Sequence, residues 1–324
     1  MNKLILAMCA TVAWMGSSCS NDDDDKPEPG NDKKLISPEM AEMAVSSEAN
    51  FTGVLMVYPC QENSSVYYGN YNAKEDISPA NAYYLVGDGS IAKSPLPALL
   101  PIGEYNFLYW GIPKNSQADS TYDNVAITEP GLRLGADLAD LSYRLRKESY
   151  SDTTYFPVYD YVHAVNPIRI GTEKMQATLQ RMVAGIRVVL TNRGGAPIDP
   201  SIASARILVG SIAGNLNFFN GEPSDFTKTV AFPLFVSADS LSLTANSTVM
   251  VFPSGNSPLL TIQLYLKDKR IKTFSKPLSG PLVAGNRLNL NITLGDLFLE
   301  PGASDGFEVE NWNETTETIN FPAG

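Results

Sequence analysis

The stretch RMVAGIRVVL, residues 181–190, decides the fold class of this chain. Its apolar side chains recur at every second position, at Met182, Ala184, Ile186, Val188 and Leu190. A period of two predicts a β-strand with one apolar face, because successive side chains of a strand point to opposite sides. The same alternation returns over residues 260–267 and 288–294. These segments predict a one-sided antiparallel sheet in the second half of the chain.

Most of the chain from Phe51 onward consists of short segments rich in Val, Ile, Tyr, Phe and Thr, separated by clusters of Gly, Pro, Asn and Asp. In the first half we expect strands near residues 53–58, 65–71, 82–86, 105–111, 124–128 and 155–163. In the second half we expect further strands near residues 204–210, 229–236, 247–252, 269–274 and 307–312. Short strands in this number predict an all-β fold made of two β-sandwich domains in tandem.

One short helix is expected within the first domain. Four leucines recur at spacings of four, three and four residues, at Leu134, Leu138, Leu141 and Leu145. This spacing places the four side chains on one face of a helix and directs the neighbouring Arg and Lys side chains toward water.

The amino terminus predicts an export signal. Lys3 is followed by an apolar stretch over residues 4–15, and small residues then lead to Cys19. Such a stretch is too short for a permanent membrane span and has the layout of a signal peptide that is removed. The expected organisation is a signal peptide over residues 1–18, an acidic disordered tether over 19–36, an N-terminal β-sandwich over 37–166 and a C-terminal β-sandwich over 167–324.

The tether begins with four adjacent carboxylates. Residues 22–25 are all Asp, and Pro27 and Pro29 follow them. Because like charges repel and prolines stiffen the chain, we expect this segment to stay hydrated and extended. A calcium site is the alternative interpretation, but neither the glycine at position six nor the distal glutamate of a calcium loop follows.

Charge and cysteine usage exclude several classes of function. The formal net charge is -11, and an acidic surface disfavours nucleic acid as a partner because phosphate binding needs clustered cations. Cys9 lies in the signal and Cys19 at its end, which leaves Cys60 alone in the folded part. No disulfide therefore forms within that part, and we expect Cys60 to be a small buried residue on a strand.

The sequence contains no recognisable pattern of catalytic residues. His163 is the sole histidine, and we expect it to pack or to face solvent rather than to catalyse. There is no CxxC pair, no HExxH, no phosphate-binding loop and no dinucleotide fingerprint. The carboxylate pairs Glu308–Glu310 and Asp137–Asp140 are adequately explained as solvated faces. We therefore expect a protein that is not an enzyme, with no cofactor and no metal.

Clustered tyrosines have two interpretations. Tyr67, Tyr68 and Tyr71 crowd one segment, and Tyr83 and Tyr84 another. Alternation along a strand directs about half of them inward, so we expect them mainly in the core; stacking on sugars is the alternative.

The residues before Cys19 resemble the signal of a bacterial lipoprotein. In that class a peptidase cuts between the positions of Ser18 and Cys19 after the cysteine thiol has been acylated. Gly16 and Ser17 stand where a strict motif has larger residues, and this looseness, like the acidic run that follows, is similar to Bacteroidetes lipoproteins. The resemblance implies a lipid-anchored protein on the outer face of the cell outer membrane.

Three segments resemble the fimbrillin superfamily of Bacteroidetes pili and, within it, the anchor-type subunits. Residues 100–111 are similar to a Gly-x-Tyr strand that ends in an aromatic residue and Gly, residues 179–188 to a Leu-x-Arg-x-Val-Ala-x-Ile/Val strand, and residues 307–313 to a closing segment. The positions that carry the resemblance are Gly103, Tyr105, Trp110, Arg181, Ala184, Ile186 and Trp312.

The resemblance implies two transthyretin-like Greek-key β-sandwiches in tandem and a structural role in a cell-surface fimbria. Subunits of the superfamily join by strand exchange after a trypsin-like protease removes the first strand. The implied partners are other fimbrial subunits, together with outer-membrane lipid through acylated Cys19. No arginine occurs before Arg133, and Lys33 and Lys34 precede the first expected strand. We therefore expect the lipid-anchored base subunit, which keeps its first strand, with tip and stalk roles as alternatives.

A surface glycan-binding lipoprotein of a polysaccharide-utilisation system is the competing class, because it shares an export signal, a tether and tandem sandwiches. Only Trp110 and Trp312 remain in the mature chain. Two tryptophans are few for a sugar-binding protein, which favours the fimbrial interpretation.

Overall fold

β-Strands form nearly all of the regular structure. The computed structural model describes residues 34–45, 49–114, 122–294, 307–308 and 317–318. Within these residues there is no α-helix, and the helical turns are the 3-10 segments Leu138–Asp140 and Arg193–Gly195. The all-β class expected from the alternating apolar pattern is confirmed.

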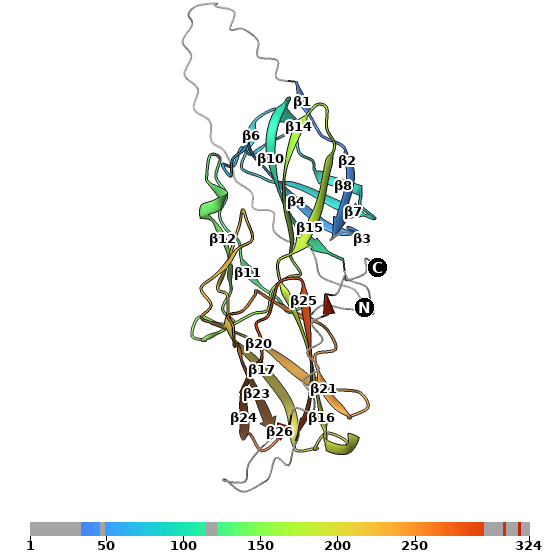
Figure 1. The fold of residues 1–324 in the computed structure, drawn as a ribbon, viewed down its shortest axis with the longest axis vertical. Helices are drawn as coiled ribbons and strands as arrows, with labels where there is room; N and C mark the ends of the chain where they lie inside the picture. Colours follow the sequence, from blue (N-terminus) through green and yellow to red (C-terminus); the bar gives the residue numbers. More distant parts are fainter. Residues whose placement is uncertain (1–33, 46–48, 115–121, 295–306, 309–316, 319–324) are drawn as a thin grey trace, which may run out of the picture. The chain divides into compact units, whose positions relative to one another are not determined.

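The first sheet contains eight strands in the order β3-β2-β15-β14-β10-β4-β7-β8 (Figure 1). The strands are β2 Met40–Val45, β3 Ala49–Asn50, β4 Gly53–Gln61, β7 Ala82–Gly87, β8 Ser90–Leu96, β10 Gly103–Pro113, β14 Val162–Ile170 and β15 Met175–Arg181. β10 pairs antiparallel with both β4 and β14 over nearly its whole length. The strands expected near residues 53–58, 82–86 and 105–111 are therefore confirmed.

The second sheet is built from strands of the second half of the chain. Its strands are β16 Ala184–Asn192, β17 Ile202–Ile212, β20 Lys228–Val236, β21 Ser242–Thr244, β22 Val249–Val251, β23 Leu259–Leu266, β24 Ile271–Pro277, β25 Asn286–Leu294, β26 Phe307–Glu308 and β27 Glu317–Thr318, with β13 Thr154–Tyr155 added from the first half. In β23 the buried side chains alternate as expected, at Leu260, Ile262, Leu264 and Leu266.

The pairing of β16 with β25 differs from the expected antiparallel arrangement. The two strands run parallel over eight residue pairs, from Gly185↔Arg287 to Asn192↔Leu294. They are far apart in the sequence, so no hairpin constrains their relative direction. Side-chain alternation is the same in parallel and antiparallel strands, which is why the sequence pattern did not reveal the direction.

Short strands complete the fold in three small sheets. They are β1 Leu35–Ile36 with β9 Leu100–Pro101, β5 Asn70–Tyr71 with β6 Ile77–Ser78, and β11 Ile127–Thr128, β12 Ser142–Leu145, β18 Asn215–Asn217 and β19 Pro223–Ser224 in one four-stranded sheet. Of the strands expected near residues 65–71, 124–128 and 155–163, only the end segments form strands. These are β5 and β11 in the small sheets, β13 in the second sheet and the start of β14 in the first.

The helix expected from Leu134, Leu138, Leu141 and Leu145 is wrong. The chain forms a single 3-10 turn over Leu138–Asp140 and then strand β12, in which Tyr143 and Leu145 point inward and Arg144 outward. A left-handed backbone at Gly135 (φ 74) and an extended backbone at Leu141 interrupt any helix. The alternation of Tyr143 with Leu145 places a large aromatic side chain in the core, and this burial outweighs the helical spacing of the leucines.

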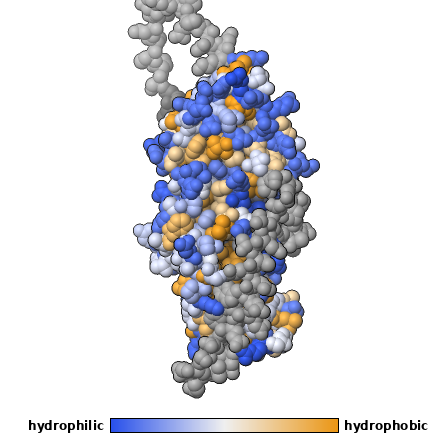
Figure 2. Space-filling view, viewed as in Figure 1, coloured by the Kyte–Doolittle hydropathy of each residue, from blue (hydrophilic) through white to orange (hydrophobic). Residues whose placement is uncertain are grey.

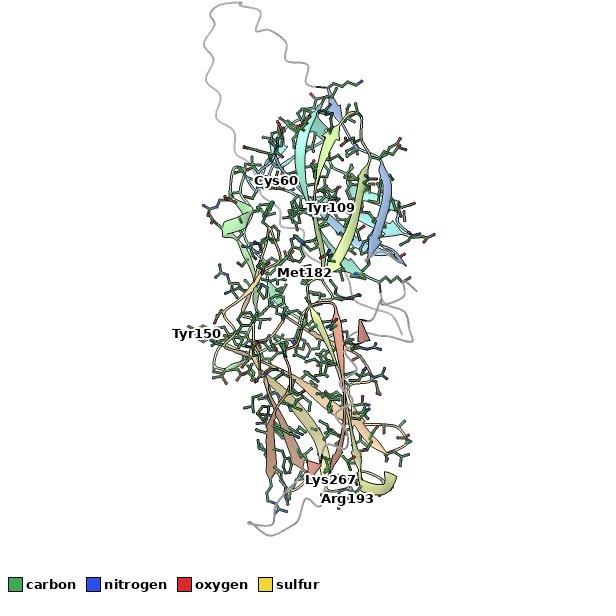
Figure 3. All side chains as sticks on the ribbon, in the orientation of Figure 1. Cys60, Tyr109, Tyr150, Met182, Arg193 and Lys267 are labelled. Carbon is green, nitrogen blue, oxygen red and sulfur yellow. The ribbon has the colours of Figure 1, made fainter. Side chains whose placement is uncertain are left out.

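One further expectation, the strand over residues 181–190, needs correction. The strand expected over residues 181–190 is broken at Met182–Val183, so that Arg181 ends β15 in the first sheet and Ala184 begins β16 in the second. The domain boundary expected between residues 166 and 167 falls inside β14. The chain passes from the first sheet to the second at Met182, which Figure 3 labels at this junction.

Two buried apolar clusters lie on opposite faces of β10. Tyr105, Phe107 and Tyr109 belong to the cluster enclosed by the first sheet, whereas Leu108 and Trp110 belong to the cluster that continues into the second sheet. This division follows from the period of two along a strand. The described residues from Lys34 onward form one compact unit.

Candidate functional site

The first long strand of the chain, β2, is seated inside the first sheet. It pairs parallel with β15 on one side and antiparallel with β3 on the other. The register with β15 shifts by one residue between Met175 and Gln176, so that Ala41 has no direct partner there. β2 is therefore an inserted strand with a pairing irregularity near its start.

Met43 fixes β2 in the apolar interior. Its side chain is fully buried in the first-sheet core, whereas Ala41 and Glu42 are exposed. The Met43 N–H donates to the Gly89 carbonyl at 3.1 Å, and the Met43 carbonyl accepts from the Phe51 N–H at 2.7 Å. Burying one methionine contributes about 1.5–3 kcal/mol. β2 is thus held by the buried Met43 side chain, by Met40 and Val45 packed against the same core, and by its backbone pairing with β15 and β3.

The entry of β2 is also tied electrostatically to the turn before β15. Lys174 Nζ lies 2.7 Å from Glu39 Oε2, and the Met175 N–H donates to the Glu39 carbonyl at 2.7 Å. The hydrogen bond and the charge of Lys174 lower the pKa of Glu39. Both side chains of this ion pair are more than half exposed, so its contribution to stability is small.

A cavity of about 720 Å³ lies beside β2, where β10, β14 and the start of β15 come together. It is lined by Ala41, Glu62, Asn63, Glu104, Tyr105, Tyr109, Asn166, Pro167, Ile168, Arg169, Glu173, Lys174 and Gln176. Arg169 forms an ion pair with Glu104, which lowers the pKa of Glu104, while the hydrogen bond that Glu62 donates to Glu104 raises the pKa of Glu62. The rim of the cavity is polar, and its inner wall belongs to the core.

The first group of residues carrying the resemblance lies on β10 and forms part of the core. Tyr105 Oη donates to the Pro101 carbonyl at 3.2 Å, next to Gly103. Trp110 is fully buried and its Nε1–H donates to the Phe218 carbonyl at 2.8 Å. The next residue, Gly111, has no room for a side chain, because a Cβ there would lie 2.9 Å from a Val162 methyl group. These residues hold the two clusters together.

The second group lies around the passage between the sheets. Arg181 ends β15 and pairs with Asp160, while Ala184 and Ile186 of β16 are buried in the cluster shared with the second sheet. The residues of both groups do not converge on one pocket; of them only Tyr105 lines the cavity beside β2. Their shared role in the described structure is packing.

Cys60 and His163 are both buried. The Cys60 thiol contacts the Tyr58 carbonyl, and burial raises its pKa to about 12, so it is not poised as a nucleophile. Burial lowers the pKa of His163 to about 4, and its Nε2 lies 2.8 Å from the Phe219 carbonyl. Cys60 on β4 is confirmed as a buried strand residue, and His163 packs against Trp110 rather than forming a catalytic pair.

Of the two carboxylate pairs, only Asp137–Asp140 lies within the described residues. Asp137 accepts from Ser65 Oγ and from the Ala139 N–H, which lowers its pKa and marks it as a turn-capping residue. Within the described residues there is no cluster of three or more His, Cys, Asp or Glu side chains suited to a metal. Nor does any helix in this part of the chain have the length and apolar character needed to cross a membrane.

Several predicted site residues lie outside the described residues. These are Ser18 and Cys19 at the expected signal cleavage site, Glu310, and Trp312. The tyrosine clusters are described: Tyr67 and Tyr84 are fully buried and their neighbours Tyr68 and Tyr83 are half-buried, as alternation predicts. Figure 2 shows hydrophobic residues only in small separate patches on the face it displays.

Sequence reasoning missed β2 and the residues that surround the cavity beside it. The signal for β2 was the apolar set Met40, Met43 and Val45, whose uneven spacing reflects the register shift and matches neither a strand nor a helix. The pairing of Asp160 with Arg181 had no sequence signal at all, because the two residues meet only when β14 turns back into β15.

The chain matches the family of Mfa2, described as fimbrillin-A associated anchor proteins Mfa1 and Mfa2, over residues 44–318. Among solved structures, the fimbrial anchor protein Mfa2 from Porphyromonas gingivalis is 13% identical with a TM-score of 0.47, covering 79% of this chain and 90% of that chain. A "putative adhesin" from Bacteroides ovatus is 11% identical with a TM-score of 0.47, covering 80% and 88%. "Putative polysaccharide binding proteins" from Bacteroides thetaiotaomicron are 16% identical with a TM-score of 0.47, covering 77% and 86%.

No curated protein matches the chain. The family match, in contrast, extends from within β2 to the end of β27. It therefore includes both sheets and the passage between them. This chain belongs to the Mfa2 family of fimbrillin-A associated anchor proteins.

Proposed function

We propose that this protein is the base subunit of a cell-surface fimbria, held in the outer membrane by acyl chains on Cys19. Membership in a family of fimbrial anchor proteins gives it a structural, non-enzymatic role in fimbriae at the cell surface. Family membership does not include three parts of this proposal: the lipid, the position at the base and assembly by strand exchange. Two or more acyl chains, at about 0.8 kcal/mol per buried methylene, make a lasting anchor.

The observation that supports the base position best is that β2 stays in the sheet and has no basic residue placed to release it. Lys33 and Lys34 precede β2, and the next basic residue is Lys74, beyond β4. A trypsin-like protease acting at Lys34 would leave β2 in the sheet but would separate the folded part from the lipid on Cys19. No arginine occurs before Arg133. A subunit that keeps its tether and its first strand stays joined to its lipid.

Strand exchange with other fimbrial subunits is the proposed mode of assembly. An incoming strand gains backbone hydrogen bonds and buries alternate side chains, which joins chains without covalent bonds. The long strands β8 and β24 that end the two sheets carry Lys and Pro: Lys93 and Pro95 in β8, and Lys276 and Pro277 in β24. Such residues discourage pairing at a free edge. Exchange therefore needs another position in the fold.

The two buried clusters support a finer description of the fold. We propose two transthyretin-like Greek-key β-sandwiches in tandem, with the passage between them at Met182–Val183. The first sheet curls around one cluster, because the Met43 N–H bonds to Gly89 next to β8 and brings the two ends of the sheet together. The second cluster is covered by β16, β17, β20 and β23.

Mass spectrometry of the protein purified from the cell surface tests the proposal. We expect an amino terminus at Cys19 that carries acyl chains, and an intact β2. An unlipidated amino terminus beyond Phe51 would rule out the base position. A glycan array on the same preparation tests the competing class, because specific binding of a polysaccharide together with absence from fimbriae would replace the fimbrial role.

A further inference from the structure

The hairpin of β14 and β15 is paired at only one end. Its ladder consists of Val162↔Arg181 and His163↔Gln180, next to the passage into the second sheet. Both strands continue toward the turn that joins them, but no further pairs form between them in the described structure. An antiparallel hairpin normally pairs along its length, so this separation is a specific feature of the fold.

On the β14 side, backbone groups point into the space between the two strands. The Arg169 N–H donates to Glu173 Oε2 at 2.8 Å, and its carbonyl accepts from the Glu173 N–H at 3.0 Å, so the backbone of Arg169 faces away from β10. Because the direction alternates along a strand, Val165 and Pro167 face the same way. Pro167 has no N–H, and it therefore offers an acceptor only.

On the β15 side, the residues with even numbers face β14. Gln176 shows this directly, because its carbonyl accepts from the Asn166 side-chain amide at 2.9 Å. Thr178 lies two residues further along the strand and is exposed. Continuing the register of the existing ladder would oppose Thr178 to Val165, yet that pair is absent. A side chain bridges the two strands where backbone bonds would otherwise form.

The cavity of about 720 Å³ opens at this separation and is within the ~300–1,000 Å³ range of ligand sites. Its inner wall is formed by Tyr105, Tyr109 and Ile168, which are 6%, 1% and 5% exposed. Its rim carries charges of both signs, including Arg169 and Lys174. The aromatic rings are too buried to offer an open face to a sugar ring. What remains accessible is two strand edges above an apolar floor.

We infer that the seam, defined as residues 165–169 of β14 and 176–178 of β15, accepts an extended strand supplied by a neighbouring chain. Backbone groups on both walls would pair with such a strand, and every second side chain of it would face Tyr105 and Ile168. A strand of this kind places an N–H opposite the Pro167 carbonyl, which sets its register. The inference rests on the proposed function for the identity of the neighbour, which is another fimbrial subunit.

In the isolated protein the Asn166 amide closes the seam. It bonds to the Gln176 carbonyl, which a strand entering from outside would claim as an acceptor. The amide must therefore rotate away when the strand enters. The seam is distinct from the position of β2, which lies on the other side of β15, so strand acceptance here leaves the first strand in place.

Hydrogen exchange measured by mass spectrometry tests the inference on the full-length protein, isolated and in purified fimbriae. Peptides covering the seam are expected to exchange about tenfold or more slowly in fimbriae than in the isolated protein, because new backbone hydrogen bonds protect them. Peptides from β23, which is paired on both sides, serve as the internal control and should not change. Unchanged exchange at the seam, or new protection confined to β8 or β24, would overturn the inference.

A matched pair of variants distinguishes the role of the Thr178 backbone N–H from that of the Thr178 side chain. Thr178→Pro removes an N–H that faces the seam, whereas Thr178→Val keeps it. We expect Thr178→Pro to lower the fimbria-bound fraction about tenfold while its melting temperature stays near that of Thr178→Val. Equal fimbria-bound fractions for the two folded variants would contradict the inference. Slower hydrogen exchange at the seam when an oligosaccharide is added to the isolated protein would also contradict it. If lipid-labelled protein enters fimbriae and its seam peptides exchange no more slowly, strand acceptance at the seam is refuted. The base-subunit proposal is then unaffected.

Discussion

Arg181 holds Asp160 in a two-point contact, with Nε 2.6 Å from Oδ1 and Nη2 2.7 Å from Oδ2. The side chains of the pair are only 6% and 1% exposed. The contact lies where β15 ends and the chain passes to β16. A buried pair with this geometry fixes the orientation of the passage between the two sheets.

Replacing one partner of this pair is expected to destabilise the fold strongly. Arg181→Met leaves the Asp160 carboxylate buried without its cation, which should lower the free energy of unfolding by about 3–5 kcal/mol. Chemical denaturation measures the loss. Arg144→Met is the matched control, because Arg144 is exposed on β12 and its loss should change stability by about 0.5 kcal/mol or less. Similar values for the two variants would mean that the pair does not stabilise the passage.

Shortening Met43 is expected to loosen β2. Met43→Ala removes the one fully buried side chain of that strand, at a cost of about 2–5 kcal/mol. Because β2 is short, the strand should open locally, and amides of Ala177 and Leu179 in the paired part of β15 should exchange faster. Glu42→Ala alters an exposed residue of the same strand and should leave those amides unchanged. Slow exchange in Met43→Ala would show that β2 is held by other contacts.

Acid is expected to destabilise the fold through His163. Its pKa is about 4 in the folded protein, below its ordinary value of 6.5, because burial disfavours the charged ring. The unfolded chain therefore binds the extra proton first as pH falls, and stability is lost between about pH 6.5 and pH 4, by about 3 kcal/mol in total.

The difference between wild type and His163→Gln isolates this effect from the carboxylates. The variant should lose less stability than wild type between pH 6.5 and pH 4, as measured by denaturation at each pH. Above pH 7 the ring is neutral in both states, so the difference should become independent of pH. If the free energy of unfolding falls in parallel for the two proteins down to pH 4, His163 is excluded as the source of the acid destabilisation.

Loss of Cys19 is expected to block maturation of the protein. Cys19→Ala removes the acylated thiol of the proposed anchor, so incorporation of labelled palmitate should vanish and the protein should accumulate as a precursor that keeps its signal peptide. Cys60→Ala removes the other cysteine of the mature chain and should keep both the label and the membrane fraction. Labelling of Cys19→Ala would place the lipid elsewhere or disprove the anchor.

The sequence predicted the strands whose burial is one-sided. In β23 the apolar residues Leu260 to Leu266 alternate strictly, since one face meets the core and the other meets solvent. Strand β7 was found for the same reason, whereas β4 and β10, which are buried on both faces, were found from their content of β-branched and aromatic residues. Periodicity reports which face is buried, and where only one face is buried it identifies the element.

The elements that were mispredicted depend on distant parts of the chain. The leucines from Leu134 to Leu145 have helical spacing, but Tyr143 packs edge-to-face on Trp110 with ring centroids 4.9 Å apart, which requires a strand. The break at Met182–Val183 is invisible in an unbroken apolar alternation, because residues on both sides are buried in different sheets. The cavity beside β2 combines residues from four strands and has no local signature.

The position of β10 between two buried clusters has a mechanical consequence. Phe107 and Trp110 anchor the same strand in different clusters, so neither half of the molecule can melt while the other keeps its native packing. We expect one calorimetric transition for the whole folded part, and two separated transitions would contradict this. A filament made of such subunits would resist stretching up to a sharp yield point, because no subunit has a weaker half that could unravel first and lengthen the fibre.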